Sequence, residues 1–241
     1  MVSKAQRFAR PEAHGPIEEV VDGVYWVRSR FRMAPGVRIS RNMTIVADGG
    51  ALTLVNPVRL SAIGERALAK LGTVAHVVKL GYFHDVDDAY TLDRFGAPYW
   101  ALPEGTRRDF PPATETLRPD HLPLRDATLF AFEDTRKPEA ALRIDRGGGV
   151  LITCDSLQHW PDTAGCSLPA KVATRRMGFL KRRATIGPPW HTAMRPKEGT
   201  LERDFRRLLD LPFEHLIGAH GAPLRGGARD AVAETVAATF G

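Results

Sequence analysis

The chain has 241 residues, of which 43% are hydrophobic and 26% are charged, as in an average globular domain. Two-sheet α/β folds reach this length as one unit, so we expect a single domain over residues 1–241. No stretch approaches the roughly 18 uninterrupted apolar residues of a spanning helix. The basic N-terminal residues are also not followed by the apolar run of a secretory signal. We therefore predict a cytoplasmic protein without a membrane partner.

The net charge of +6 results from 34 basic and 28 acidic residues. Its densest part is the group Arg175, Arg176, Lys181, Arg182 and Arg183. A basic group of this kind can attract nucleic acid or an anionic substrate. Because few aromatic residues are interleaved with it and it matches no nucleic-acid motif, we expect a solvated helix or loop. Nucleic acid is therefore not the partner that we expect.

The first third of the chain has the pattern of a β-meander followed by a strand–helix–strand unit. Short runs rich in β-branched and aromatic residues at 24–27, 43–46 and 52–55 are separated by turn formers. Residues 61–72 carry apolar residues at helical spacing, with Ser61 as the N-cap and Gly72 as the stop. Strands are predicted again at 74–80 and 98–102, with a short helix before the second.

The rest of the chain is predicted to alternate between strands and helices around one long excursion. Strands are expected at 128–133, 140–144 and 150–153, with a tight turn at the three glycines 147–149. Residues 161–196 are rich in proline, glycine and basic residues, which indicates a long irregular excursion with one helix. A helix at 200–211, a strand at 213–217 and an amphipathic helix at 228–240 complete the chain.

Common catalytic motifs other than metal sites are missing from the sequence. Ser156 lacks the G-x-S-x-G pattern around a hydrolase nucleophile, and no G-x-G-x-x-G or P-loop pattern opens a helix. The two cysteines, Cys154 and Cys166, show no spacing typical of zinc ligands or of a nucleophile. Because Cys154 ends an apolar run, we expect it to be a buried free thiol rather than part of a disulfide.

Potential metal ligands follow three of the predicted strands. His84 and Asp88 come after the run 74–80, Asp155 follows the run 150–153, and His220 follows the run 213–217. In open α/β sheets, ligands bind just beyond the carboxyl ends of the strands. A lone histidine beside a glycine is usually a turn residue, and an acidic run usually caps a helix. The order of these residues along the chain nevertheless favours a common site.

In this order the chain resembles the metallo-β-lactamase-fold hydrolases, from about residue 23 to the C-terminus. The resemblance implies an α/β fold built as a four-layer αββα sandwich. The first motif of that family, H-x-H-x-D-H, corresponds to the segment 84–89, which reads HDVDDA. His84 and Asp88 match this motif, whereas Val86 and Ala89 stand where two ligand histidines would be.

The later ligands of the family are also only partly matched. Its bridging aspartate corresponds to Asp155 and its final histidine to His220, but its mid-chain histidine corresponds to the segment 133–139, which has none. The resemblance thus implies a first metal position reduced to His84 and Asp155, and a second one with Asp88, Asp155 and His220. We predict at most one divalent metal, Zn²⁺, Mn²⁺ or Fe²⁺, with a metal-free site as the alternative.

Further residues near these motifs have assigned or open roles. A metal would acidify a water molecule and polarise a carbonyl or phosphoryl oxygen, with Asp85 or Asp87 as the carboxylate that orients the water. His159 and His191, each beside a tryptophan, are either replacement ligands or imidazoles packed on indole, and we favour packing. Glu139 either replaces the missing mid-chain histidine or is a turn residue, and we favour the turn.

Two functions are compatible with this pattern. The first is a metal-dependent hydrolase with a single-metal site that acts on a small-molecule substrate. The alternative is a metal-free binding or scaffold protein that keeps the fold, in which apolar Val86 and Ala89 would fill the space of the missing ligands. A nucleic-acid-associated role ranks last because it depends only on the net charge and the basic group. The sequence specifies neither the substrate nor an oligomeric state.

Overall fold

The computed structural model describes residues 8–241, and residues 1–7, on which part of the secretory-signal argument depends, lie outside this range. Seven strands form one sheet in chain order, β1 to β7. The first three pairings are antiparallel, and the three from β4 to β7 are parallel. The strands are β1 (Ile17–Val21), β2 (Val24–Ala34), β3 (Val37–Asp48), β4 (Ala51–Val55), β5 (Thr73–Val78), β6 (Tyr99–Ala101) and β7 (Glu115–Thr116).

A second sheet has the order β13-β10-β9-β8, in which β13 and β10 run parallel. Its strands are β8 (Ala127–Ala131), β9 (Ala140–Ile144), β10 (Val150–Ile152) and β13 (His215–Ile217), and a separate pair is formed by β11 (Leu157–Gln158) and β12 (Thr185–Ile186). The helices are α1 (Ala62–Leu71), α2 (Asp88–Phe95), α3 (Leu168–Arg176), α4 (Pro188–Met194), α5 (Glu202–Leu208) and α6 (Ala228–Phe240).

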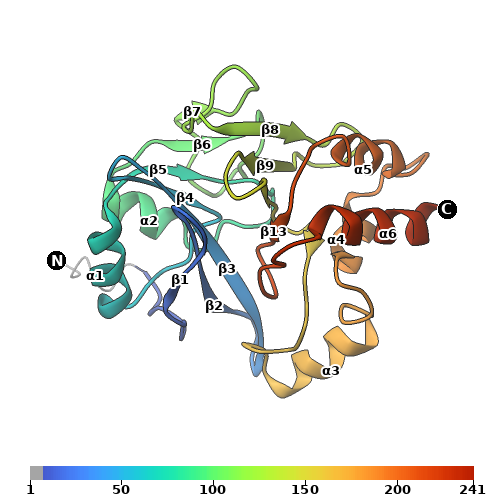
Figure 1. Ribbon diagram of the computed structural model, residues 1–241. Helices are drawn as coiled ribbons and strands as arrows, with labels where there is room; N and C mark the ends of the chain where they lie inside the picture. The colour runs from blue at the N-terminus through green and yellow to red at the C-terminus, as the bar shows by residue number, and fades with distance from the viewer. Residues whose placement is uncertain (1–7) are drawn as a thin grey trace.

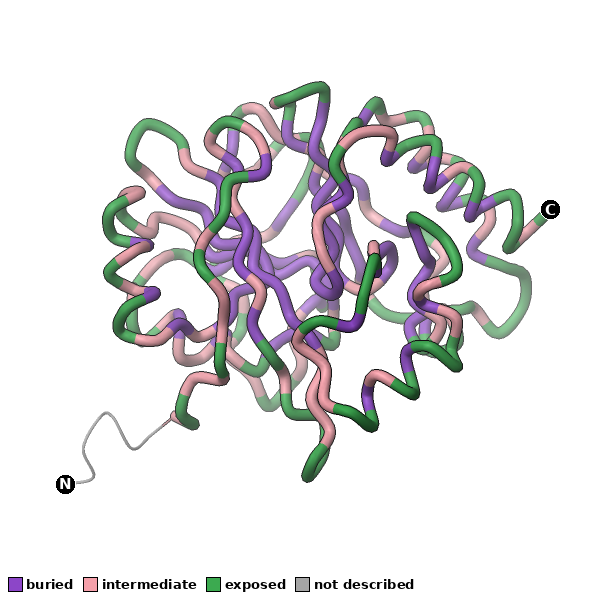
Figure 2. Tube along the Cα trace, turned by 60° about the horizontal axis from the view of Figure 1, so that its bottom comes forward, coloured by how far each residue is buried: buried purple, intermediate pink, exposed green. Residues whose placement is uncertain are grey.

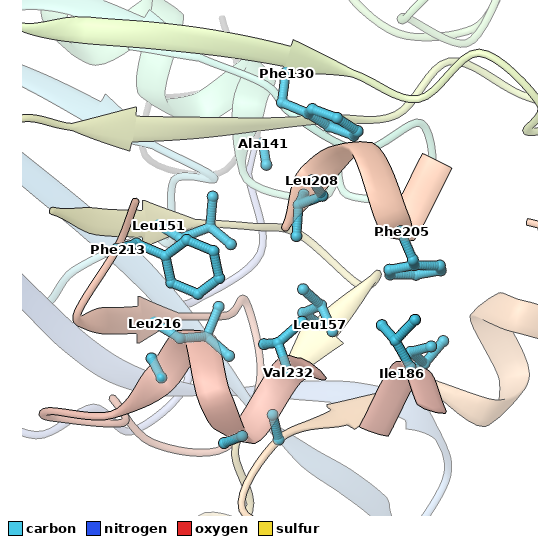
Figure 3. Close-up of a cluster of buried hydrophobic side chains, with 14 of the residues drawn as sticks. Phe130, Ala141, Leu151, Leu157, Ile186, Phe205, Leu208, Phe213, Leu216 and Val232 are labelled. Atoms are coloured by element: carbon cyan, nitrogen blue, oxygen red, sulfur yellow. The ribbon is translucent and has the colours of Figure 1, made fainter. Parts of the chain in front are cut away.

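Helices cover the outer faces of the two large sheets, as Figure 1 shows. One apolar cluster lies between the sheets and includes Val46 of the first and Ile152 of the second. Leu54 and Leu68 belong to a cluster that packs the first sheet on α1. A third cluster packs the second sheet on α4, α5 and α6, and Phe205 lies within it (Figure 3). These four layers are the predicted αββα sandwich.

Local signals in the sequence explain where the elements begin and end. The Ser61 side chain accepts a hydrogen bond from the Gly64 amide at 3.3 Å, which caps α1 as predicted. The three glycines 147–149 form the predicted turn between β9 and β10, all with positive φ. A side chain at Gly149 would come within 2.6 Å of the Pro212 carbonyl oxygen, so this position also requires a close backbone approach.

The excursion 161–196 contains more regular structure than predicted. It includes two helices, α3 and α4, and the short strand β12, where the sequence indicated a single helix. Proline in the first turn of each helix supplies the start, since a proline there loses no hydrogen bond. The start of α3 is fixed to β3 because the Ser167 amide donates to the Arg38 carbonyl oxygen at 2.9 Å. No helix within 8–241 combines the length and apolar character needed to cross a bilayer.

Candidate metal centre

Three of the predicted ligands meet at one edge of the sandwich. His84 lies in the loop between β5 and α2, Asp155 follows β10, and His220 follows β13. β10 and β13 pair in parallel from Val150 to Ile152, so the chain ends that carry Asp155 and His220 emerge side by side. His84 reaches them from the first sheet. The site therefore joins both sheets of the sandwich.

The donor atoms of these three residues form a nearly equilateral triangle. Nε2 of His84 lies 3.1 Å from Nε2 of His220 and 3.2 Å from Oδ1 of Asp155. Nε2 of His220 lies 3.0 Å from the same carboxylate oxygen. Two imidazole nitrogens and one carboxylate oxygen directed at one point are a donor set of mononuclear metal sites. The arrangement fits one divalent cation.

Protonation favours metal binding at this triangle. Nδ1 of His220 donates to the Ser40 carbonyl oxygen at 2.5 Å, so Nε2 is the ring nitrogen that faces the triangle. Burial lowers the pKa of His84 to about 4, against the opposing charge of Asp155, so its ring is neutral near pH 7. Burial alone would raise the pKa of Asp155, but His84 and His220 outweigh it and hold that pKa well below its usual range.

Asp88, the other predicted ligand, has different partners in the structure. It is the first residue of α2 and is fully buried. One carboxylate oxygen accepts a hydrogen bond from the Tyr99 hydroxyl and lies 3.9 Å from Nζ of the buried Lys79. Burial raises the pKa of Asp88, and the Lys79 ammonium opposes that rise. The other oxygen has no hydrogen-bond partner among the residues that the structure describes.

The two carboxylates predicted to orient water are both paired with arginines. Asp85 is buried and lies 2.6 Å from Nε of Arg107. Asp87 lies 3.5 Å from a terminal nitrogen of Arg41 and keeps a quarter of its side chain exposed. Of the two, Asp87 therefore combines access to solvent with the weaker pairing. Its role as the orienting carboxylate stays a prediction.

A buried glutamate and a buried thiol lie directly beside the triangle. Oε1 of Glu139 accepts a hydrogen bond from the Asp155 amide at 3.3 Å. Burial and the charge of Asp155 raise the pKa of Glu139 well above its usual range, which favours the neutral acid. The Cys154 sulfur shares a group with His84 and Asp155 in which the donor atoms lie within 4.8 Å of one another. The spacing of Cys154 in the sequence gave no sign of its proximity to His84, because that proximity arises across the two sheets.

The two other histidines considered as ligands have separate contacts. Nδ1 of His159 bonds the Arg183 carbonyl oxygen at 2.5 Å. His191 packs edge-on against the ring of Phe240 at a centroid distance of 5.7 Å. Val86, which a metal-free site would use as a filler, is instead 52% exposed.

Two residues of β3 and one residue just after β4, all missed by sequence reasoning, hold the ligand loops in place. The Asn42 side chain donates to the Gly218 carbonyl oxygen at 2.9 Å, and the Ser40 hydroxyl accepts from the Gly221 amide at 3.0 Å. β3 is therefore hydrogen-bonded to the chain on both sides of His220. Asn56 links the first sheet to the second. The sequence does carry one signal for this role, since 40–42 is a run of three polar residues inside a strand and all three are buried.

A pocket of about 400 Å³ opens onto the triangle. His84, Asp155, His220, Gln158 and the buried Arg41 supply polar groups to its wall. Most of the remaining wall is apolar, with aromatic rings from Phe31, Phe83, Trp160, Phe179 and Trp190. A pocket of this size with a few convergent polar groups is typical of a small-molecule site.

Neither a protein-family model nor a curated protein matches the sequence. Solved structures match the fold along almost the whole chain. A metallo-β-lactamase from Hirschia baltica has 14% identity and a TM-score of 0.63 and covers 93% of this chain and 98% of its own. The FIM-1 metallo-β-lactamase from Pseudomonas aeruginosa in a mono-zinc form has 13% identity and a TM-score of 0.62, with 95% and 98% covered. The DIM-1 metallo-β-lactamase exposed to ceftazidime has 12% identity and a TM-score of 0.65 and covers 96% of this chain and 100% of its own.

At these identities the likeness is one of fold. The chain has the fold of these metallo-β-lactamases, as the resemblance of its sequence implied.

Proposed function

We propose that the protein is a metal-dependent hydrolase with a single divalent cation held by His84, Asp155 and His220. The observation that carries the proposal is the triangle of donor atoms, with sides of 3.0 to 3.2 Å. Two histidines and one carboxylate hold Zn²⁺ in hydrolytic sites and Fe²⁺ in non-haem sites, and Mn²⁺ accepts similar donors. Cys154 is a further donor, because its sulfur lies within 4.8 Å of donor atoms of His84 and Asp155.

A bound cation would supply Lewis-acid chemistry, which acidifies water and polarises a carbonyl or phosphoryl oxygen. The chain's own residues would bind and orient the substrate. Arg41 lines the pocket, and its Nε has no hydrogen-bond partner among residues 8–241, so its guanidinium is a cation that could bind a carbonyl or anionic group of the substrate. Asp87, which lies 3.5 Å from Arg41 and is partly exposed, is the carboxylate that we propose to accept a proton.

The pocket wall indicates the general shape of the small-molecule substrate. Polar groups lie around the triangle and Arg41, while the aromatic and aliphatic side chains form the rest of the wall. A substrate with a hydrolysable polar group joined to an apolar body fits this division, because the apolar part then leaves water. We therefore expect esters or amides with apolar acyl or aryl groups to be better substrates than small polar ones.

The proposal is tested by metal analysis and hydrolysis on protein purified without chelator or histidine tag. We expect about one metal per chain, and Asp155→Asn or His220→Ala should weaken metal affinity by roughly 100-fold or more, since even outer-shell changes cost 10- to 100-fold. Turnover of p-nitrophenyl esters should be higher for longer acyl groups. For each ester it should fall as the metal content of the protein falls.

His159→Ala is the matched control, because it removes an imidazole that bonds Arg183 instead of the triangle. It should leave the metal content unchanged. Preparations of wild-type protein that contain no stoichiometric metal, and gain none on addition of Zn²⁺, Mn²⁺ or Fe²⁺, would contradict the proposal and favour the metal-free binding protein.

A further inference from the structure

The exposed apolar side chains of the molecule gather around the mouth of the pocket. Four of the large exposed hydrophobics line the pocket itself: Met33, Phe83, Val86 and Met177. Two more, Leu168 and Val172, lie one helical turn apart on α3, with Leu168 75% exposed. Among the described residues, Ile63 on α1 is the only other member of this set. We call Met33, Phe83, Val86, Met177, Leu168 and Val172 the apolar rim, which does not include Ile63.

The same part of the chain is strongly basic. Residues 163–197 include no aspartate or glutamate. Exposed cations at the end of α3 and after it are Arg175, Arg176, Lys181, Arg182 and Arg183. None of these five forms an ion pair with a residue that the structure describes. Their charge is therefore not neutralised within the described chain.

Met33 of the rim lies on the β2–β3 hairpin, whereas Leu168, Val172, Arg175 and Arg176 lie on α3, and these two elements lie together. The tip of the β2–β3 hairpin, which carries Met33, and α3 are neighbours at the lower end of the molecule in Figure 1, and Figure 2 turns this end toward the viewer. Reciprocal hydrogen bonds between Arg38 and Ser167 join them: the Arg38 amide donates to the Ser167 hydroxyl at 3.0 Å and the Ser167 amide donates to the Arg38 carbonyl at 2.9 Å. The hairpin and α3 thus present one continuous surface.

We propose that this surface docks on an anionic lipid membrane, with the mouth of the pocket facing the bilayer. Apolar side chains beside cations on a short helix are typical of segments that bind at a membrane interface. The apolar groups enter the boundary of the acyl chains, and the cations contact lipid phosphates. A nucleic acid would satisfy the cations but would leave the apolar rim in water. The sequence-based expectation of no membrane partner concerned spanning segments, and this surface needs none.

Docking itself does not depend on a metal. Only the use of the pocket for a lipid-derived substrate with an apolar body rests on the proposed function. Failure of docking and failure of the hydrolase proposal are therefore separable, because vesicle binding can be measured in the presence of a chelator.

The test is co-sedimentation with vesicles of equimolar phosphatidylcholine and phosphatidylglycerol, compared with pure phosphatidylcholine. We expect roughly tenfold or stronger preference for the anionic vesicles, decreasing with added salt. Arg175→Glu with Arg176→Glu should remove most of this binding. The matched control, Arg66→Glu with Lys70→Glu on the exposed face of α1, makes the same change in net charge and should leave binding intact.

A second pair of variants tests the apolar rim. Leu168→Ser with Val172→Ser should weaken binding by several-fold, whereas Ile63→Ser on α1 should not, and the melting temperature of each variant shows whether it is folded. The proposal would be overturned if the α1 controls lost as much vesicle binding as the α3 variants, or if the rim variants bound like the wild type. Binding to duplex DNA without binding to anionic vesicles would also overturn it.

Discussion

Asn56 shows how much one side chain contributes to the position of the candidate site. Its Oδ1 accepts from the Leu80 amide at 3.2 Å, and its Nδ2 donates to the Thr153 carbonyl oxygen at 3.1 Å. One amide group therefore ties the end of β5 to the end of β10, the two places from which His84 and Asp155 emerge. The backbone of Asn56 has φ 52°, in the left-handed region that asparagine tolerates better than most residues.

Asn56→Ala should destabilise the protein by about 3 kcal/mol, because it leaves two buried backbone groups without partners and places alanine at positive φ. Urea unfolding at constant pH measures the difference. Asn56→Gly removes the same hydrogen bonds but tolerates the positive φ, so it should cost less than the alanine variant. Wild-type stability of Asn56→Ala would show that the link between the strand ends is dispensable.

At the scale of elements, Asp204 connects α5 to the loop after β8. The buried carboxylate accepts hydrogen bonds from the amides of Glu133 and Asp134 at 2.9 and 2.8 Å, and it pairs with Arg207 at 2.8 Å. The segment 133–139 has neither a regular element nor the histidine that the family pattern would place there. Its conformation is held from outside by α5.

Asp204→Ala should lower the free energy of unfolding by about 2 to 4 kcal/mol, since it leaves two backbone amides without their acceptor, while Arg207 keeps its ion pair with Glu133. Glu202→Ala on the same helix is the comparison, because it removes a largely exposed ion pair with Arg206 and should cost less than about 0.5 kcal/mol. Chemical denaturation of both variants gives the two values. Similar losses for both would mean that Asp204 only supports the helix.

At the scale of the molecule, the three candidate ligands join the two sheets. His84 belongs to the first sheet, and Asp155 and His220 belong to the second, with an apolar cluster between them. A cation held by all three binds the folded chain and has no such site in the unfolded one. Metal binding should therefore stabilise the whole sandwich rather than one loop.

Metal at about 100 times its dissociation constant should add about 2.7 kcal/mol of stability. For a chain of this length, that corresponds to a rise of about 5 to 10 °C in melting temperature. Differential scanning calorimetry with Zn²⁺ or Mn²⁺, before and after chelator, measures the shift, and His84→Ala should abolish it. A shift that persists in His84→Ala would place the metal elsewhere.

The sequence by itself determined most of the secondary structure and the order of the candidate ligands. Periodicity, the Ser61 cap and the glycine turn at 147–149 are local signals, and the elements that they predicted are present. The strand-end positions of His84, Asp155 and His220 followed from the same local patterns. α3 and α4 were not both foreseen, because their proline-rich and basic sequence carries little helical periodicity and their stability depends on packing against other elements.

Only the tertiary structure decided which donors meet. The motif placed His84 with Asp155 in one metal position and Asp88 with Asp155 and His220 in another, whereas the folded chain brings His84, Asp155 and His220 together and Asp88 is bonded to Tyr99 and near Lys79. That outcome depends on contacts between residues far apart in the sequence, such as Asn42 with Gly218. The direction of each side chain is set by these contacts across the two sheets, and no local pattern in the sequence specifies them.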